Sequence, residues 1–193
     1  MVVALQPERP YVLALPRGGV PVGAAVAAAL RAPLEVVVAR KLGAPSYPEY
    51  ALGAVAEGGV RVLNSQVLAH PRLLAVDLEA LTERELAAVV GAVGRFRHGA
   101  PLPSLAGRTA VVVDDGLATG VTAEAALAAV SKLGPQRLVL AAPVCASETI
   151  DRLAPVVDDL VCVERPRDMR AVGLWYRDFT QTTDDEVLTL LGR

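Results

Sequence analysis

Short apolar runs alternate along the chain with alanine-rich stretches of helical composition. Residues 11–15 (YVLAL) form the first apolar run, and a glycine-containing loop separates them from an alanine-rich stretch at 22–30. A second apolar run, 34–39 (LEVVVA), follows and ends in Arg40 and Lys41. Continuous apolar runs of this length are typical of strands buried on both faces. The order therefore predicts a strand, a helix and a parallel second strand.

The same alternation resumes after residue 108. Further strands are predicted at 109–114, 136–142 and 158–164. Helices are predicted at 122–132, at 148–154 and from about residue 184. Alternating strands and helices with nearly unbroken apolar strands predict an α/β fold with an open, doubly wound, mainly parallel sheet. The length of 193 residues is within the range of one domain, so we expect residues 1–193 to form a single domain.

The middle of the chain has a different pattern. Residues 42–50 (LGAPSYPEY) mix glycine, proline and serine, which predicts a mobile loop. Two apolar segments then flank Gly58-Gly59, a dipeptide suited to a hairpin turn. A helix is expected to end near Arg97, and either Asp77 or Thr82 is placed to cap its start.

Composition and charge narrow the function classes. Hydrophobic residues make up 53% of the chain and aromatic residues only 4%, as expected for a core of Val, Leu and Ala. The net charge of -2 provides no general electrostatic footprint for nucleic acid or an anionic membrane, so neither is an expected partner. Cys145 and Cys162 fall at apolar strands and are expected to be buried thiols without chemistry. No leader or membrane-length apolar segment is recognised, which predicts a cytoplasmic protein.

The most informative stretch is VVVDDGLATGVT, residues 111–122. It places Asp114 and Asp115 at the carboxyl end of an apolar strand, where ligands bind in open parallel sheets. A hairpin turn at Asp115-Gly116 is the alternative, but the residues that follow are strong helix formers. Small residues before a helix start can wrap an anion, and paired carboxylates accept hydrogen bonds from vicinal hydroxyls. The stretch therefore predicts a site for a ribose 5-phosphate.

This stretch resembles the phosphoribosyl-diphosphate (PRPP) binding motif of type I phosphoribosyltransferases. The resemblance implies that Asp114 and Asp115 engage the ribose hydroxyls and contribute to catalysis. It also implies that one continuous segment binds the 5-phosphate, namely Ala118, Thr119, Gly120, Val121 and Thr122. The resemblance covers most of the chain from Tyr11 to Glu164 and implies a type I phosphoribosyltransferase-like fold with a small hood subdomain, and a possible homodimer.

Two further stretches match anion sites of that family. PRGG at 16–19 corresponds to the pyrophosphate loop, so Arg17, Gly18 and Gly19 are expected to bind the diphosphate, often beside a cis peptide bond. Arg40 and Lys41 are similar to the Arg-Lys pair that precedes the mobile catalytic loop in adenine phosphoribosyltransferases, which implies diphosphate binding and catalysis. The alternative for Gly18 and Gly19 is that glycines are common in the turn before a helix. The alternative for Arg40 and Lys41 is a solvated charge pair at a strand end.

The resemblance also implies how the reaction is assisted. A Mg²⁺ ion chelated by the diphosphate and ribose oxygens would stabilise the leaving group, with no direct protein ligand and with Asp114 and Asp115 reached through water. The segment 42–57, with polar residues at Ser46, Tyr47 and Glu49, is expected to close over PRPP. Glu57 is a candidate acid or base, although a glutamate beside a turn is usually only solvated.

The acceptor is less well indicated. Position 118 is alanine, and adenine enzymes also have alanine at this position. Hypoxanthine-guanine enzymes instead carry an aspartate there, which serves the purine ring. Adenine enzymes, however, have a longer segment before the first core strand than this chain has before Tyr11. The hood is therefore expected from parts of 60–105 and 165–193. Trp175 and Tyr176 are candidates for stacking on a flat acceptor, and packing of the tail onto the core is the alternative.

Together these features predict a phosphoribosyltransferase that transfers ribose 5-phosphate from PRPP to a small nitrogenous acceptor, which could be a nucleobase. The alternative is a regulatory protein of the same fold that senses PRPP or a nucleotide without catalysis. Such a sensor need not keep Arg40, Lys41 and the segment after them.

Overall fold

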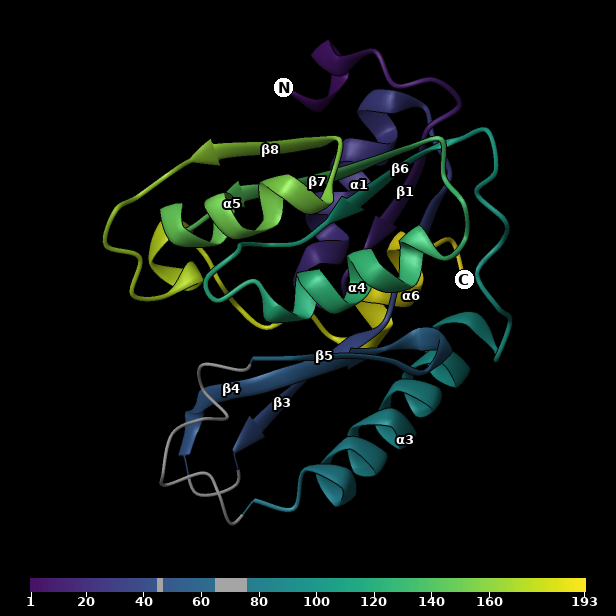
Figure 1. Ribbon diagram of the computed structural model, residues 1–193. Helices are drawn as coiled ribbons and strands as arrows, with labels where there is room; N and C mark the ends of the chain where they lie inside the picture. Colours follow the sequence, from purple (N-terminus) through teal and green to yellow (C-terminus); the bar gives the residue numbers. More distant parts are fainter. Residues whose placement is uncertain (45–46, 65–75) are drawn as a thin grey trace.

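The larger part of the molecule is an open parallel sheet flanked by helices (Figure 1). The computed structural model describes residues 1–44, 47–64 and 76–193. Within these residues, strands pair in the order β2-β1-β6-β7-β8, and every neighbouring pair is parallel. Their bounds are Tyr11–Ala14 for β1, Leu34–Val36 for β2, Thr109–Val113 for β6, Arg137–Val144 for β7 and Asp159–Glu164 for β8. The predicted α/β fold with an open, mainly parallel sheet is confirmed.

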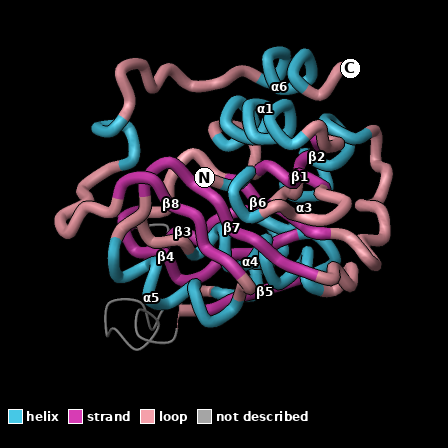
Figure 2. The backbone as a smooth tube through the Cα atoms, turned by 90° about the horizontal axis from the view of Figure 1, so that it is seen from above, coloured by secondary structure: helices cyan, strands magenta, loops and turns pink. Residues whose placement is uncertain are grey.

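Helices cover both faces of this sheet (Figure 2). One face packs against α1 (Gly19–Leu30), and α6 (Asp184–Leu190) lies against the outer side of α1. The other face is covered by α4 (Val121–Ser131) and α5 (Ser147–Leu153). The strand β6 is buried along its whole length, and its alternate residues belong to two different apolar clusters, one on each face. Burial on both faces explains why its sequence is a continuous apolar run.

A second, antiparallel sheet lies beside the first (Figure 1). It consists of β3 (Ala39–Ala44), β4 (Tyr47–Ala56) and β5 (Val60–Leu63), and a turn at Glu57–Gly59 joins the last two strands. The hairpin predicted at Gly58-Gly59 is therefore confirmed.

The loop expected at 42–50 is wrong for the described residues of that segment, 42–44 and 47–50, because they belong to β3 and β4. Leu42 and Ala44, at alternate positions, are buried in one apolar cluster with Leu52. Their burial against α3 (Leu78–Arg97) overrides the turn propensity of the glycine and prolines. The opposite face of the sheet packs on α4, so that α4 lies between the two sheets. Ser46 and the side chains of Tyr47 and Glu49 lie outside the described residues.

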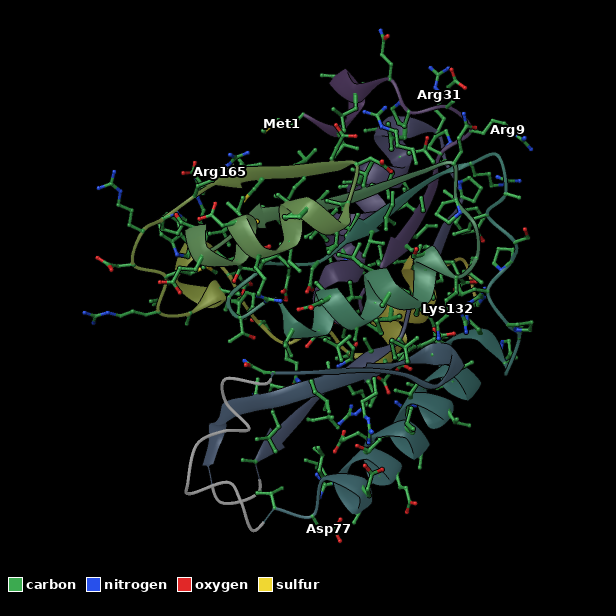
Figure 3. The ribbon with its side chains drawn as sticks, viewed as in Figure 1. Met1, Arg9, Arg31, Asp77, Lys132 and Arg165 are labelled. Carbon is green, nitrogen blue, oxygen red and sulfur yellow. The ribbon has the colours of Figure 1, made fainter. Side chains whose placement is uncertain are left out.

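The helix α3 starts one turn earlier than the Thr82 alternative would place it. Asp77 caps it by accepting a hydrogen bond from the amide of Ala80 at 3.0 Å, and Figure 3 labels Asp77 at the far end of the second sheet. Thr82 lies inside the helix and donates to the carbonyl of Leu78. The region 60–105 named for the hood thus contributes β5 and α3, and its residues 65–75 are not described.

The C-terminal segment runs back along the main sheet. A short turn, η5 (Val172–Trp175), follows β8, and a capping box at Thr183 and Glu186 starts α6. Further short turns within the described residues are η1 (Val2–Leu5) and η4 (Ala154–Val156). Tyr176 of this tail bonds to Asp115, and Asp184 bonds to Arg17, so the tail lies near the loops that follow β1 and β6, where the candidate site is found.

Among the described helices, none has the length and apolar character needed to span a membrane.

Candidate functional site

The loops after β1 and β6 meet at one edge of the main sheet. The two strands are parallel neighbours, with Ala14 opposite Val113, so their carboxyl ends lie side by side. Beyond them, a Cβ atom on Gly18 would lie 1.8 Å from a carboxylate oxygen of Asp115. Such an approach is open only to glycine. The structure thus brings the PRGG loop and the acid pair together, on the edge where open parallel sheets bind ligands.

Asp114 and Asp115 are adjacent carboxylates that interact with each other. The amide of Asp115 donates to a carboxylate oxygen of Asp114 at 2.9 Å. Burial, and then the neighbouring Asp115, raise the pKa of Asp114. Burial also raises the pKa of Asp115. Carboxyl groups that are partly withdrawn from water in this way interact strongly with hydroxyl donors that reach them.

The segment after the acid pair, residues 118–122, has the backbone geometry of an anion-binding site, and we call it the anion cradle. Gly120, with φ of 64°, is the residue before α4, and within the described residues no side chain caps this helix start. The first amides of a helix have no partner inside the helix, so they are available to a bound anion. Ala118 and Thr119 are exposed, whereas Leu117 is buried and its amide bonds to the carbonyl of Val144 at 2.8 Å. The predicted 5-phosphate segment therefore begins at the exposed residues Ala118 and Thr119 and continues through Gly120 into the first turn of α4, which contains Val121 and Thr122.

Arg17 lies on the same edge of the sheet. The peptide bond between Pro16 and Arg17 is cis, as the family resemblance implies. The Arg17 guanidinium contacts the Asp184 carboxylate of α6 at 3.2 Å, and the same carboxylate contacts Arg95 of α3 at 3.0 Å. Gly19 starts α1 close to the carbonyl of Val113. Asp184 therefore links the loop that carries Arg17 to both α6 and α3.

Arg40 and Lys41 do not end a strand of the main sheet, because β2 ends at Val36 and both residues lie inside β3. As consecutive strand residues they face opposite sides of the second sheet. Arg40 donates from Nε to Glu85 of α3 at 2.7 Å. Lys41 pairs in register with Ala54, whose side chain is in the apolar cluster on the α4 side. The strand expectation for this pair was wrong because packing against α3 extends the chain into a new sheet.

The Glu57 carboxylate forms its contacts with other groups of the protein. Its carboxylate accepts a hydrogen bond from the amide of Val38 at 2.7 Å and forms an ion pair with Arg97. The Arg97 side chain is 2% exposed and also donates to the carbonyl of Val36 at 3.3 Å. Buried arginine requires such a partner. The arrangement gives Glu57 a structural role that ties the turn after β4 to the end of α3.

The C-terminal tail contacts the acid pair. The Tyr176 hydroxyl donates to the backbone carbonyl of Asp115 at 2.5 Å, and burial raises the pKa of Tyr176 to about 12. The Phe179 ring lies 5.1 Å from that of Tyr176, centroid to centroid. Both rings line a cavity of about 1030 Å³ together with Arg17 and Asp115. Trp175 is 45% exposed and lies outside this cavity, so of the two acceptor candidates the structure brings only Tyr176 to the site.

Two residues of α5 were missed by the sequence analysis. Thr149 donates to the carbonyl of Ala118, and Arg152 donates to the carbonyl of Thr119. They follow the loop by about thirty residues in sequence, and no motif marks them. Among the described residues, no group of three or more His, Cys, Asp or Glu side chains could hold a metal ion.

Comparison with known proteins agrees with this geometry. The phosphoribosyl transferase domain family matches residues 5–173. Two curated Mycobacterium tuberculosis proteins, from strains H37Rv and CDC 1551, bear names that assign them provisionally to the phosphoribosyl transferases. Each is 47% identical over 182 residues, which is 94% of this chain and 41% of the relative, so the chain spans about two fifths of their length.

A solved structure is similar over nearly the whole chain. The protein TT1426 from Thermus thermophilus shares 42% sequence identity and superposes with a TM-score of 0.75. The match covers 98% of this chain and 90% of that chain. The family match to residues 5–173 covers far more than half of the chain. The chain therefore belongs to the phosphoribosyl transferase domain family.

Proposed function

We propose that this protein transfers ribose 5-phosphate from PRPP to a small nitrogenous acceptor and releases diphosphate. The observation that carries the proposal is the meeting of three parts at one edge of the sheet. These are the acid pair, the uncapped start of α4 and the loop that carries Arg17. Together they match the hydroxyls, the 5-phosphate and the diphosphate of a single compound.

The proposed reaction breaks the bond between the anomeric carbon and the diphosphate oxygen and forms a bond from that carbon to the acceptor nitrogen. The diphosphate leaves with the bonding electron pair, and the acceptor nitrogen loses a proton to the surrounding water. Positive charge develops on the ribose ring and negative charge on the leaving group. Asp114 and Asp115 would hold the ring hydroxyls, while Arg17 would face the departing anion.

The residues present fit a Mg²⁺ ion that arrives with the substrate. Asp114 and Asp115 supply hard carboxylate oxygens, which suit this ion through its water shell, but two carboxylates make no complete protein site. When bound, the ion would neutralise charge on the diphosphate. Arg17 and the backbone amides of the loops would perform the remaining orientation.

A second candidate function is a sensor that binds PRPP or a nucleotide without transfer. The specific observation in its favour is the position of two predicted catalytic residues. Arg40 pairs with Glu85 and Glu57 pairs with Arg97, so both side chains are used within the second sheet and α3. A binding protein would need the acid pair and the anion cradle but neither Arg40 nor Glu57.

One experiment separates the two functions. The protein is mixed with Mg²⁺, PRPP and a panel of nucleobases and amines, and diphosphate release is followed. We expect acceptor-dependent release that Asp114→Asn lowers by about 100-fold or more. The exposed Asp151 of α5 offers a matched control, because Asp151→Asn should leave the rate unchanged. Binding of PRPP without release across the whole panel would favour the sensor.

A further inference from the structure

The loop that follows the acid pair is held from behind by α5. Thr149 donates its hydroxyl hydrogen bond to the carbonyl of Ala118, and Arg152 donates from Nη2 to the carbonyl of Thr119. The two donors are three residues apart, so they lie on one face of the helix. Two consecutive carbonyls of the loop therefore point toward the same face of α5.

The direction of these carbonyls determines the direction of two amides. In a trans peptide the C=O and N–H groups point to opposite sides. The contact with Thr149 turns the N–H of Thr119 away from α5, and the contact with Arg152 does the same for the N–H of Gly120. These amides precede the uncapped first turn of α4. A run of amides aimed to one side is the arrangement that binds a phosphate.

The packing around these contacts is tight. Thr149 is 4% exposed, and a Cβ atom on Gly120 would lie 2.3 Å from its methyl group. Arg152 also forms an ion pair with Glu124 of α4, so its guanidinium links the loop to the helix that follows. The charge of Arg152 is therefore matched by a carboxylate. Its contribution to an anion site is orientation of the loop more than direct attraction.

We propose that Thr149 and Arg152 are positioning residues of the anion cradle: they hold the loop carbonyls so that the amides of Thr119 and Gly120 face the bound 5-phosphate. This inference rests on the proposed function, because it takes a ribose 5-phosphate group as the ligand. Neither side chain is required to touch that ligand. Their sequence distance from the motif means that α5 completes a site whose recognisable residues all precede it.

The test measures binding of ribose 5-phosphate to the full chain by calorimetry. Thr149→Val keeps the shape of the side chain and removes its hydroxyl, and we expect about tenfold weaker binding, the effect of losing one oriented hydrogen bond. Thr149→Ser retains the hydroxyl and should remain within about threefold of wild type. Arg152→Gln should also weaken binding about tenfold. The matched control is Glu124→Gln, which removes the charge pair but leaves the contact from Arg152 to the loop.

Two further measurements separate positioning from loss of the fold. Binding of inorganic diphosphate, which the Arg17 loop would hold, should be unchanged in Thr149→Val. The NMR shifts that ribose 5-phosphate induces in the amides of Thr119 and Gly120 should shrink in that variant. Equal binding of ribose 5-phosphate by wild type and Thr149→Val would overturn the inference, as would parallel losses for both anions.

The outcomes for the proposed function are distinct. Wild-type protein that binds ribose 5-phosphate through Thr149 but releases no diphosphate with any acceptor would support the inference and contradict transfer. Acceptor-dependent transfer that is unaffected in Thr149→Val and Arg152→Gln would support the function and overturn the inference. Absence of any binding of ribose 5-phosphate by wild type would overturn both.

Discussion

Replacing Gly18 by alanine would place a methyl group against the Asp115 carboxylate. The backbone of Gly18 has φ of -60° and ψ of -34°, a conformation that alanine adopts without strain. The added Cβ, however, would lie 1.8 Å from the nearer carboxylate oxygen and 2.8 Å from the carboxylate carbon. The substitution thus perturbs the position of one acidic side chain while it leaves the local backbone acceptable.

The size of the effect follows from these distances. A carbon and an oxygen without a bond between them approach to about 3.3 Å. The oxygen must therefore move by about 1.5 Å, whereas functional groups are held within about 0.5 Å of their productive positions. A misplacement of about 1 Å can lower a rate about 100-fold. We expect Gly18→Ala to lower kcat/KM by at least about 100-fold, or about 2.7 kcal/mol.

Stability should respond much less than activity. Alanine restricts the unfolded chain more than glycine does, which stabilises the fold by about 0.4–1 kcal/mol and offsets part of the cost of moving Asp115. We expect the free energy of unfolding to change by less than about 1 kcal/mol, which corresponds to a Tm shift of about 2–4 °C.

The assay is the initial rate of diphosphate release from PRPP with an active acceptor, beside a thermal melt of the same preparation. Gly91→Ala in α3 is the matched control, because a Cβ there would meet no atom within 4 Å. It should keep full activity. If Gly18→Ala retains wild-type kcat/KM, the position of Asp115 against the PRGG loop is not needed for the reaction, and the reasoning is refuted.

Three further predictions test the electrostatics around the site. Burial and Asp115 raise the pKa of Asp114, so the folded protein retains a proton that the unfolded chain has lost above about pH 4. The free energy of unfolding should fall as the pH rises from there through neutrality, and Asp114→Asn should flatten that fall in urea titrations; an unchanged pH profile would contradict this. Tyr176→Phe removes the bond to the Asp115 carbonyl and should cost about 1 kcal/mol in thermal melts, equally at about pH 6 and about pH 8.5, since both values lie well below the ordinary tyrosine pKa of about 10 and burial raises the pKa of Tyr176 further, to about 12; a difference that disappears at the higher pH would be the opposing result. Glu57→Ala leaves the buried Arg97 unpaired and should lower the free energy of unfolding by about 3 kcal/mol in urea; a loss of kcat with unchanged stability would instead assign Glu57 to catalysis.

The strands and helices of the main sheet could be predicted, in their order along the chain, because the signals for them are local. Strands buried on both faces are apolar at nearly every position, so the runs YVLAL and VVV can be recognised as strands from the sequence. The position of the acid pair could also be predicted, because parallel strands bring their carboxyl ends to one edge of the sheet whatever the details of packing. The placement of the PRGG loop beside Asp115, which Gly18 approaches closely, follows from this topology.

Local signals predicted the hairpin of β4 and β5 in the second sheet but not β3 or the start of β4. Residues 42–50 have the composition of a loop, and their described part becomes strand only because Leu42 and Ala44 are buried against α3. The same packing turns Arg40 toward Glu85. A pairing between residues about forty positions apart leaves no trace in the residue pattern.

Sequence alone determined the strands of the main sheet, the edge of that sheet that carries the candidate site and the residues of that edge that belong to one continuous motif. Only the tertiary structure decided which distant side chains support them: Arg97 for Glu57, Tyr176 for the Asp115 carbonyl, and Thr149 with Arg152 for the loop. The physical reason is that a hydrophobic run or a glycine loop acts through its own neighbours in the chain. A hydrogen bond or an ion pair instead depends on which elements the folded core brings together.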